Sequence, residues 1–349
     1  MKLIELHILQ SFPVSCLNRD DVGAPKTAVF GGVTRARISS QCLKRAIRNC
    51  AKELLPELNQ GIRSRYILPL FAQALERQEV KTATGEKLAR EIAAFFNEID
   101  KKDERRVKTA MFLSPGEVAD IAKALAEIAK KRDPTAADIK KACKSASRMD
   151  AADIAIFGRM VANDSSVSIE GAGMFGHALS THRAENDIDF FSAVDEAKPE
   201  DVPAGAAITD TLEFTSATYY RYAGLNLNLL ADEGHLGALS SKNRESVVDT
   251  FVRATVLAVP GARKNSMNAH TLPGYVLGIV KDKGQPLQLI NAFENPVISK
   301  NGFMEASITA LKEHHERLKK NWAIEPTVEV AIPERSLDEF CKEVLAHAA

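Results

Sequence analysis

Two serines and a pair of cations near residue 40 have the types and spacing that suit anion binding. Ser39 and Ser40 are favourable N-caps, and they predict a helix over residues 41–55. Free backbone N–H groups and the positive end of the helix dipole would attract a phosphate there. Lys44 and Arg48 lie four residues apart, so one helical face would present both to a second phosphate. The alternative is a basic face that meets only solvent.

A second row of cations consists of Lys140, Lys144 and Arg148, again at intervals of four residues. This spacing would place them on one face of a helix, where they could guide a nucleic-acid strand by its phosphates. Rows of this kind most often serve solubility. The pattern leaves both interpretations open.

Histidines and aspartates further along the chain are of metal-ligand types. His177 and His182 precede Asp187 and Asp189, which would suit a metal-dependent nuclease. A separation of five residues, however, turns two helical side chains about 140° apart, so the histidines would not share one metal. Solvated or hydrogen-bonded histidines are the simpler interpretation.

A glycine triplet, Gly171-Ala-Gly-Met-Phe-Gly176, matches the dinucleotide-binding fingerprint of oxidoreductases. Residues 165–170 before it are too polar for the buried parallel strand that the fingerprint follows, and no βαβ unit surrounds it. Loop glycines explain the match. The sequence also has no phosphate-binding loop, nucleophile elbow or zinc-protease motif. We therefore expect no catalytic residue, no metal and no other cofactor.

Composition indicates an ordinary folded chain. Its 349 residues are 45% hydrophobic and 26% charged, with a formal net charge of zero. Neutrality argues against nonspecific nucleic-acid binding, yet eight cations face two acids between residues 19 and 52. Five scattered cysteines form no CxxC pair, which favours reduced thiols. With no signal peptide or membrane span expected, the prediction is a cytoplasmic protein that does not bind a membrane.

The pattern of elements predicts an α+β fold. Residues 61–155 form a helical insertion, because apolar residues recur there at helical spacing and Ser114-Pro-Gly-Glu117 and Asp133-Pro-Thr-Ala136 resemble helix starts. The body around the insertion is expected to contain strands over residues 3–9, 275–280 and 287–290, and helices over residues 41–55, 303–318 and 337–345.

A long hairpin is predicted after the glycine triplet. Residues 186–194 and 211–220 are rich in aromatic and β-branched side chains, and the segment between them has the Pro, Gly and acidic content of a loop. Because side chains alternate along a strand, Phe190 and Phe191 would place one ring on each face.

Ten short motifs, in order along the chain, together resemble one known family. They are Ser15-Cys-Leu-Asn-Arg-Asp-Asp21, Phe30-Gly-Gly32, Arg37-Ile-Ser-Ser-Gln41, Leu43-Lys-Arg-Ala46, Gly158-Arg-Met160, His177-Ala-Leu-Ser-Thr-His182, Asp187-Ile-Asp-Phe-Phe191, Tyr220-Arg-Tyr-Ala223, Val259-Pro-Gly-Ala262 and Asn291-Ala-Phe-Glu294. The series resembles the CasC family, the backbone, crRNA-binding subunit of the type I-E CRISPR Cascade complex. Each motif alone is weak, whereas ten in register are specific.

The resemblance implies a hand-shaped subunit. Its palm would hold an RRM-like (ferredoxin-like) sheet, its fingers would be helical, and its thumb would be a β-hairpin. The corresponding boundaries are 1–60, 156–182 and 219–349 for the palm, 61–155 for the fingers and 183–218 for the thumb.

The implied role is assembly, without catalysis. Several copies of the subunit would line up along crRNA beside other Cascade subunits, each palm holding the RNA backbone. The thumb of a neighbouring copy would displace one nucleotide at a regular interval, at a stacking cost of about 1–3 kcal/mol per base. The remaining base edges would stay free to pair with target DNA.

The resemblance also assigns roles to individual residues. The RNA contacts would be Arg19, Lys26, Ser39, Gln41, Lys44 and Arg48 in the palm, with Arg159 and Met160 in the fingers. The apolar thumb wedge would be Phe190, Phe191 and Val194, where the family often has Trp at the first position. Lys300 would be a candidate DNA contact, because it falls in a loop that the family links to that role. The row of Lys140, Lys144 and Arg148, which its spacing alone indicates, is a further candidate DNA contact.

One enzymatic alternative stays open. Related backbone proteins of other CRISPR types cut target RNA with an acidic loop residue. On that model, His182, Asp187 and Asp189 would form a metal-dependent ribonuclease site within the effector complex.

Overall fold

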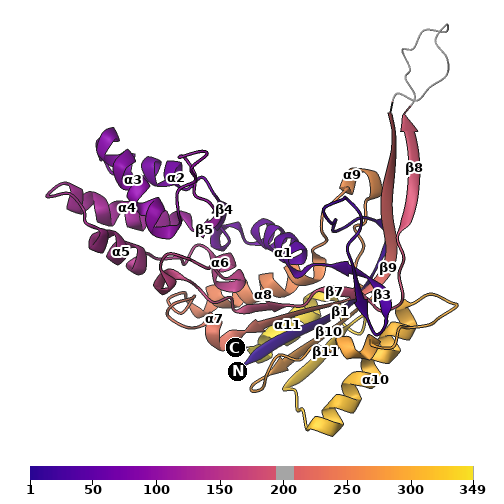
Figure 1. Cartoon of the computed structure of the whole chain (residues 1–349). Coiled ribbons are helices and arrows are strands. Elements are labelled where there is room, and N and C mark those ends of the chain that lie inside the picture. Colours follow the sequence, from indigo (N-terminus) through magenta and orange to yellow (C-terminus); the bar gives the residue numbers. More distant parts are fainter. Residues whose placement is uncertain (194–207, 349) are drawn as a thin grey trace, which may run out of the picture.

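The structure, a computed structural model, describes residues 1–193 and 208–348. Figure 1 shows three parts: a helix-covered sheet, a group of helices to one side, and a two-stranded ribbon that projects from the sheet. We call these the sheet body, the helical module (residues 62–145) and the hairpin (residues 187–193 and 208–214). The chain is α+β with an antiparallel sheet, as the sequence predicts.

The sheet has the strand order β11-β10-β1-β9-β7-β3-β2, and β6 and β8 also pair with β9. All of these pairs are antiparallel. The strands are β1 (Leu3–Ser15), β2 (Thr27–Phe30), β3 (Val33–Ile38), β6 (Gly173–Phe175), β7 (Ala178–Ser180), β8 (Asp187–Ala193), β9 (Ile208–Asn226), β10 (Tyr275–Lys281) and β11 (Val328–Ile332).

The two faces of the sheet are covered by different helices, and the alternation of β1 decides which side chain meets which. Ile4, Leu6 and Ile8 join one core with α6 (Ala152–Phe157), α8 (Ser241–Leu257) and α11 (Leu337–Ala348). Leu9 faces the other side, in a core with α10 (Met304–Trp322) and the 3₁₀ helix η3 (Ile290–Phe293). The strand predicted over residues 3–9 is confirmed and extends to Ser15.

The strand expected over residues 287–290 is wrong. β10 is already paired on both edges, by β1 and β11, so this apolar segment finds no free strand edge beside it. It packs across the face of the sheet instead, where the Leu289 N–H donates to the Tyr220 hydroxyl at 2.8 Å. The Leu287 N–H likewise donates to Glu5, which is buried on β1.

The helical module has a hydrophobic core of its own, in which Phe71, Phe96, Ile121 and Leu125 are fully buried. Its elements are β4 (Ile62–Ser64), α2 (Leu68–Glu76), α3 (Thr82–Phe96), β5 (Met111–Leu113), α4 (Pro115–Ala129) and α5 (Ala136–Ser145), with β4 and β5 forming a two-stranded sheet. The predicted helical character of this region is confirmed.

Both predicted helix starts in the module exist, with one change of cap. Ser114 is the N-cap of α4, and its Oγ accepts a hydrogen bond from the Glu117 N–H at 2.9 Å. The cap of α5 is Thr135 rather than Asp133, because Thr135 forms a reciprocal capping box with Asp138.

The three predicted helices of the sheet body are also confirmed, as α1 (Ser40–Leu54), α10 and α11. Shorter helical turns are η1 (Pro56–Leu58), η2 (Ser165–Val167), α7 (Leu227–Leu230) and α9 (Lys264–Met267). None of the helices within the described ranges is long and apolar enough to cross a membrane.

The predicted hairpin is present and continuous with the sheet. β8 pairs with the first part of β9, from Asp187 opposite Phe214 to Ala193 opposite Ile208, and β9 then runs on into the sheet body. The hairpin is therefore anchored to the central strands at its root (Figure 1).

Candidate nucleic-acid interface

Helix α1 places a row of cations beside its buried face. Leu43, Ile47 and Ala51 recur at intervals of four residues and pack into the sheet body. Lys44 and Arg48 each follow one of these buried residues, so both lie half-exposed at the border of the buried face. The amphipathic pattern of α1 therefore places the charges of Lys44 and Arg48 at the edge of its solvent-exposed face.

Neighbouring elements place further cations near this row. Burial raises the pKa of the Cys42 thiol, and the cations of Arg45 and Lys26 next to it act in the opposite direction. Burial lowers the pKa of His177, and the charges of Arg37 and Lys26 lower it further. We define the α1 basic surface as Arg19 and Lys26 from the loop of residues 16–26, Arg37 from β3, Lys44, Arg45 and Arg48 from α1, and Arg63 from β4.

No member of the α1 basic surface forms an ion pair with any residue that the structure describes, in contrast to Arg65, Lys140, Arg148 and Arg159. The positive charges therefore remain without an ion-pair partner at a surface that Arg19, Gln41 and Arg45 expose to solvent. Such a surface attracts phosphates through the charge itself, with an affinity that falls as salt is added.

The N-terminus of α1 differs from the prediction of free backbone donors. Ser39 is only 8% exposed, and its Oγ accepts a hydrogen bond from the Cys42 N–H at 3.3 Å. The Ser39 N–H donates to Asn18 Oδ1 at 2.8 Å, and the Ser40 N–H donates to His177 Nδ1 at 3.1 Å. Ser39 therefore serves as an internal cap, because the loop before β2 and the start of β7 supply acceptors that the sequence pattern does not reveal.

The loop of residues 16–26 is held in a fixed turn. Asp20 Oδ1 accepts hydrogen bonds from the Val22 N–H at 3.0 Å and the Ala24 N–H at 2.9 Å. The Lys26 N–H donates to the Asn18 carbonyl at 2.9 Å. Arg19 is exposed on this turn, as a phosphate contact requires.

Arg48 lies at the joint between α1 and the helical module. Its guanidinium carbon is 5.1 Å from the centroid of the Phe112 ring on β5. Burial lowers the pKa of Arg48, whereas the charge of Asp153 raises it. Asp153 is itself buried and accepts a hydrogen bond from the Gly61 N–H at 3.2 Å. Arg48 thus links two parts of the fold as well as contributing charge to the surface.

Arg159 is placed inside the molecule, which contradicts its expected RNA contact. It is 5% exposed, and its Nη1 donates to Glu117 Oε2 at 2.7 Å and to the Phe112 carbonyl at 3.1 Å. Its Nη2 and Nε donate to the Val167 carbonyl. These internal acceptors satisfy the guanidinium and leave it no surface for a phosphate.

Met160, by contrast, is 83% exposed directly after this buried arginine. A large thioether side chain in that position has no internal packing to explain it. Its placement agrees with a side chain that contacts an external apolar group.

The second basic row is neither continuous nor free. Lys140 Nζ pairs with Asp164 at 2.7 Å, and Arg148 pairs with the buried Glu117 at 3.3 Å. α5 ends at Ser145, so Arg148 lies beyond the helix that was to carry all three cations. Lys144 alone of the three is exposed without an ion pair to a described residue.

The hairpin presents apolar side chains to solvent. Ile188 is 70% exposed and Phe190 is 68% exposed, and both lie on the same face of β8, two residues apart. Phe191, on the opposite face, is 42% exposed. Val194, the third predicted wedge residue, lies outside the described residues. Lys300 is exposed in the loop before α10.

His182 is a structural residue. Its Nδ1 donates to the Arg183 carbonyl at 2.7 Å, and its Nε2 accepts a hydrogen bond from the Thr218 N–H at 3.2 Å. The ring stacks on Phe303 at a centroid distance of 3.7 Å. Both ring nitrogens are therefore occupied, and the described ranges contain no group of three or more side chains suited to hold a metal.

The glycine triplet lies where its backbone passes close to the backbone at the end of α6. β6, which lies within the triplet, is antiparallel to β9, so the segment lacks the parallel strand-to-helix turn of a dinucleotide site. A Cβ on Gly171 would lie 2.9 Å from the Ile156 carbonyl oxygen. Glycine is needed here for packing.

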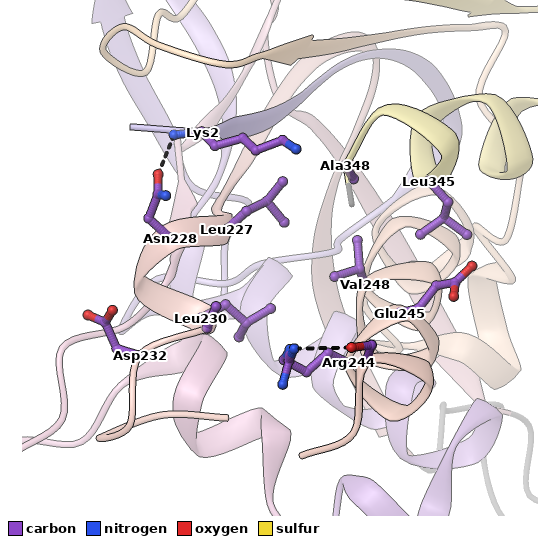
Figure 2. A pocket seen from close by; sticks show the side chains of 12 residues that line it. Lys2, Leu227, Asn228, Leu230, Asp232, Arg244, Glu245, Val248, Leu345 and Ala348 are labelled. Atoms are coloured by element: carbon purple, nitrogen blue, oxygen red, sulfur yellow. Dashed lines mark hydrogen bonds between the residues drawn. The ribbon is translucent and has the colours of Figure 1, made fainter. Parts of the chain in front are cut away.

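A pocket of about 620 Å³ opens elsewhere, between α7, α8 and the end of α11. Figure 2 shows Leu227, Leu230, Val248 and Leu345 around it. Arg244, which also lines the pocket, donates hydrogen bonds to the Gly237 and Leu239 carbonyls. The pocket is mainly apolar and shares no residue with the α1 basic surface.

Sequence reasoning missed Arg37, Arg45 and Arg63 as members of the basic surface. Arg37 falls two residues before the cap of α1, and Arg63 belongs to a short strand that no periodicity revealed. The density of cations around α1 was a usable signal for Arg37 and Arg45. Arg63 comes near Arg48 through long-range pairing, because it lies opposite Phe112 in the β4–β5 pair and Arg48 lies over the Phe112 ring.

Comparisons with known proteins agree on one group. A family model described as "CT1975-like protein" matches residues 4–345. A solved chain described as "CRISPR RNA-guided surveillance complex, pre-nicking" is 27% identical, with a TM-score of 0.81 over 99% of this chain and 100% of that chain. A chain of another structure, described as "CRISPR RNA-guided surveillance complex", is 23% identical, with a TM-score of 0.71 over 99% of each chain, and shows a shared fold. No curated protein sequence matches. The family resemblance inferred from the ten motifs is confirmed.

Proposed function

The chain belongs to the CT1975-like protein family, and we propose that it is a non-catalytic backbone subunit of a type I-E CRISPR RNA-guided surveillance complex. The observation that carries the proposal is the α1 basic surface, whose cations form no ion pair with a described residue, on a chain without excess charge. Its cations would hold the phosphates of a guide RNA irrespective of base sequence.

In this proposal, the three parts of the fold take the roles of a hand. The sheet body is an RRM-like palm, the helical module forms the fingers and the hairpin is the thumb. Met160 and the hairpin side chains Ile188 and Phe190 are large, apolar and exposed. They would contact unstacked bases, since an aromatic or apolar surface can replace part of the lost stacking.

Several copies would bind side by side along one crRNA, together with other Cascade subunits, in the cytoplasm. Backbone contacts leave base edges available, so target DNA would be recognised by pairing with the guide. Lys144 and Lys300 remain candidate DNA contacts because both are exposed. Lys140 and Arg148 are weaker candidates, since carboxylates already neutralise them.

The ribonuclease alternative receives little support from the site. Asp187 and Asp189 are exposed on the hairpin, but both nitrogens of His182 are used internally. Incubation of the purified protein with RNA and Mg²⁺ or Mn²⁺ tests this directly. Cleavage that Asp187→Ala abolishes would overturn the non-catalytic assignment.

Electron microscopy of the protein co-expressed with a guide RNA tests the assembly. The expected particles contain several copies at a constant spacing along the RNA, and longer guides recruit more copies. Particles with one copy per RNA, whatever the guide length, would refute the backbone role.

A further inference from the structure

A second cationic segment lies close to the α1 basic surface. The loop of residues 258–274 joins α8 to β10 and contains the short helix α9. Between Asp249 and Asp282 the sequence has no acidic residue at all. Lys264 and the polar residues Asn265, Ser266 and Asn268 are exposed in this loop.

Both stems of this loop are fixed to the sheet body. On the α8 side, the buried Arg221 donates to the Thr255 carbonyl at 2.7 Å and to the Ala258 carbonyl at 3.4 Å. On the β10 side, Gln10 donates to the Thr271 carbonyl at 2.7 Å, and the Thr271 hydroxyl donates to the Ser11 carbonyl at 2.8 Å. The loop is therefore a positioned element whose cations have a defined place.

Packing puts the loop beside the elements of the α1 basic surface. Ala258 and Ala269 belong to the same hydrophobic cluster as Leu17, from the loop of Arg19, and Leu43 of α1. In Figure 1, α9 lies near α1 and the root of the hairpin. Burial raises the pKa of the Cys16 thiol, and the charges of Arg263 and Arg19 oppose that rise, so both cations lie near this thiol.

Arg263 has an unsatisfied donor. Its Nε is buried and has no hydrogen-bond partner among the described residues. Its backbone adopts a left-handed conformation with φ of 52°, which is uncommon for a residue other than glycine and costs about 1 kcal/mol or more. Its carbonyl accepts hydrogen bonds from the Ser266 and Met267 N–H groups, which hold that conformation. A buried, unpaired guanidinium donor is costly unless an acceptor arrives.

We propose that the loop of residues 258–274 is a second wall of the RNA-binding surface, on which Arg263 and Lys264 contact the ribose–phosphate backbone. This inference rests on the proposed function and extends it to residues outside α1. Arg263 supplies the planar donor set that suits phosphate oxygens, and Lys264 supplies an exposed point charge. Asn265, Ser266 and Asn268 add neutral donors of the kind that contact sugar and phosphate.

The test is the salt dependence of binding to a labelled single-stranded RNA oligonucleotide. Each lost single-strand phosphate contact should reduce the log–log slope by about 0.7, so the double variant Arg263→Gln/Lys264→Gln should lose about 1.4. The variant Lys320→Gln/Lys342→Gln is the matched control, because it removes two exposed charges from α10 and α11, and its slope should not change.

Two further variants separate the possible outcomes. If Arg263→Gln/Lys264→Gln keeps the wild-type slope while Lys44→Gln/Arg45→Gln lowers it, the loop assignment is overturned and the proposed function stands. If neither changes the slope, the proposed function itself fails. Should the loop variant melt at a lower temperature than wild type, the exposed single variant Lys264→Gln decides: a fall of about 0.7 supports the inference, and no fall refutes it.

Discussion

Two rows of basic side chains with the same four-residue spacing have opposite surroundings in this protein. On α1, Lys44 and Arg48 form no ion pair with any described residue, although the charge of the buried Asp153 acts on Arg48. In and after α5, Lys140 pairs with Asp164 and Arg148 pairs with Glu117. Spacing alone therefore does not identify a binding surface. The difference lies in whether the fold pairs the cations with acids: two of the three cations near α5 form ion pairs, and neither cation of the α1 row does.

The same contrast separates Arg19 and Arg159, two arginines that the family resemblance assigns to RNA contact. Arg19 is exposed on a fixed turn, whereas Arg159 is enclosed with Glu117, a carboxylate with no exposed surface. Arg19 is accessible to a ligand, and Arg159 ties the segment after the helical module to Glu117 within it.

The largest expected effect follows from removing the internal arginine. Arg159→Ala leaves Glu117 buried without its main partner, which should lower the free energy of unfolding by about 3–5 kcal/mol. Chemical denaturation measures this loss. Arg105→Ala is the control, because Arg105 pairs with Asp103 at the surface, where solvent screens the charges, and its loss should change stability little. Unchanged stability with weakened RNA binding would instead make Arg159 a ligand contact.

A smaller effect is expected from an exposed ring of the hairpin. Phe190→Ala should weaken assembly on guide RNA by about 1–3 kcal/mol, the value of one base–aromatic stack, while the thermal stability of the free protein stays the same. Co-purification with guide RNA and a melting curve give the two readouts. Trp322→Ala removes an equally exposed ring from α10 and should leave assembly intact. Equal losses in both variants would deny the hairpin a specific role.

The smallest effect concerns His177, which reports the charge of the α1 basic surface. Burial, with Arg37 and Lys26, lowers its pKa below the ordinary 6.5. The folded protein therefore favours the neutral ring, and the stability this contributes is complete above pH 6.5 and is lost as pH falls through the lower, folded pKa. An NMR titration should show the pKa rising when RNA binds, because phosphate charge offsets the two cations. A pKa that RNA leaves unchanged would place the strand elsewhere.

Much of the fold could be predicted from local sequence signals. The serine caps before α1 and α4, the apolar periodicity of residues 61–155 and the alternating hairpin each depend on neighbours close in sequence. Residues 287–290 could not be placed this way, because an apolar run does not show that both edges of β10 are already paired.

The candidate site was predicted less completely, for a similar reason. Lys44, Gln41 and Arg19 reach solvent as expected, but Ser39 and Arg159 do not. Their acceptors come from distant positions: Ser39 bonds Asn18 through its backbone, and Arg159 meets Glu117 across the helical module. Long-range partners of this kind decide whether a polar residue serves the fold or a ligand.

The most direct test of the α1 basic surface is the salt dependence of RNA binding by Lys44→Gln/Arg45→Gln, with Lys320→Gln/Lys342→Gln as the control. Arg48 is left intact because it also packs on Phe112. The account predicts a log–log slope reduced by about 1.4, equally for unrelated RNA sequences, and an unchanged slope for the control. A wild-type slope in the α1 variant, or a loss confined to one RNA sequence, would contradict it.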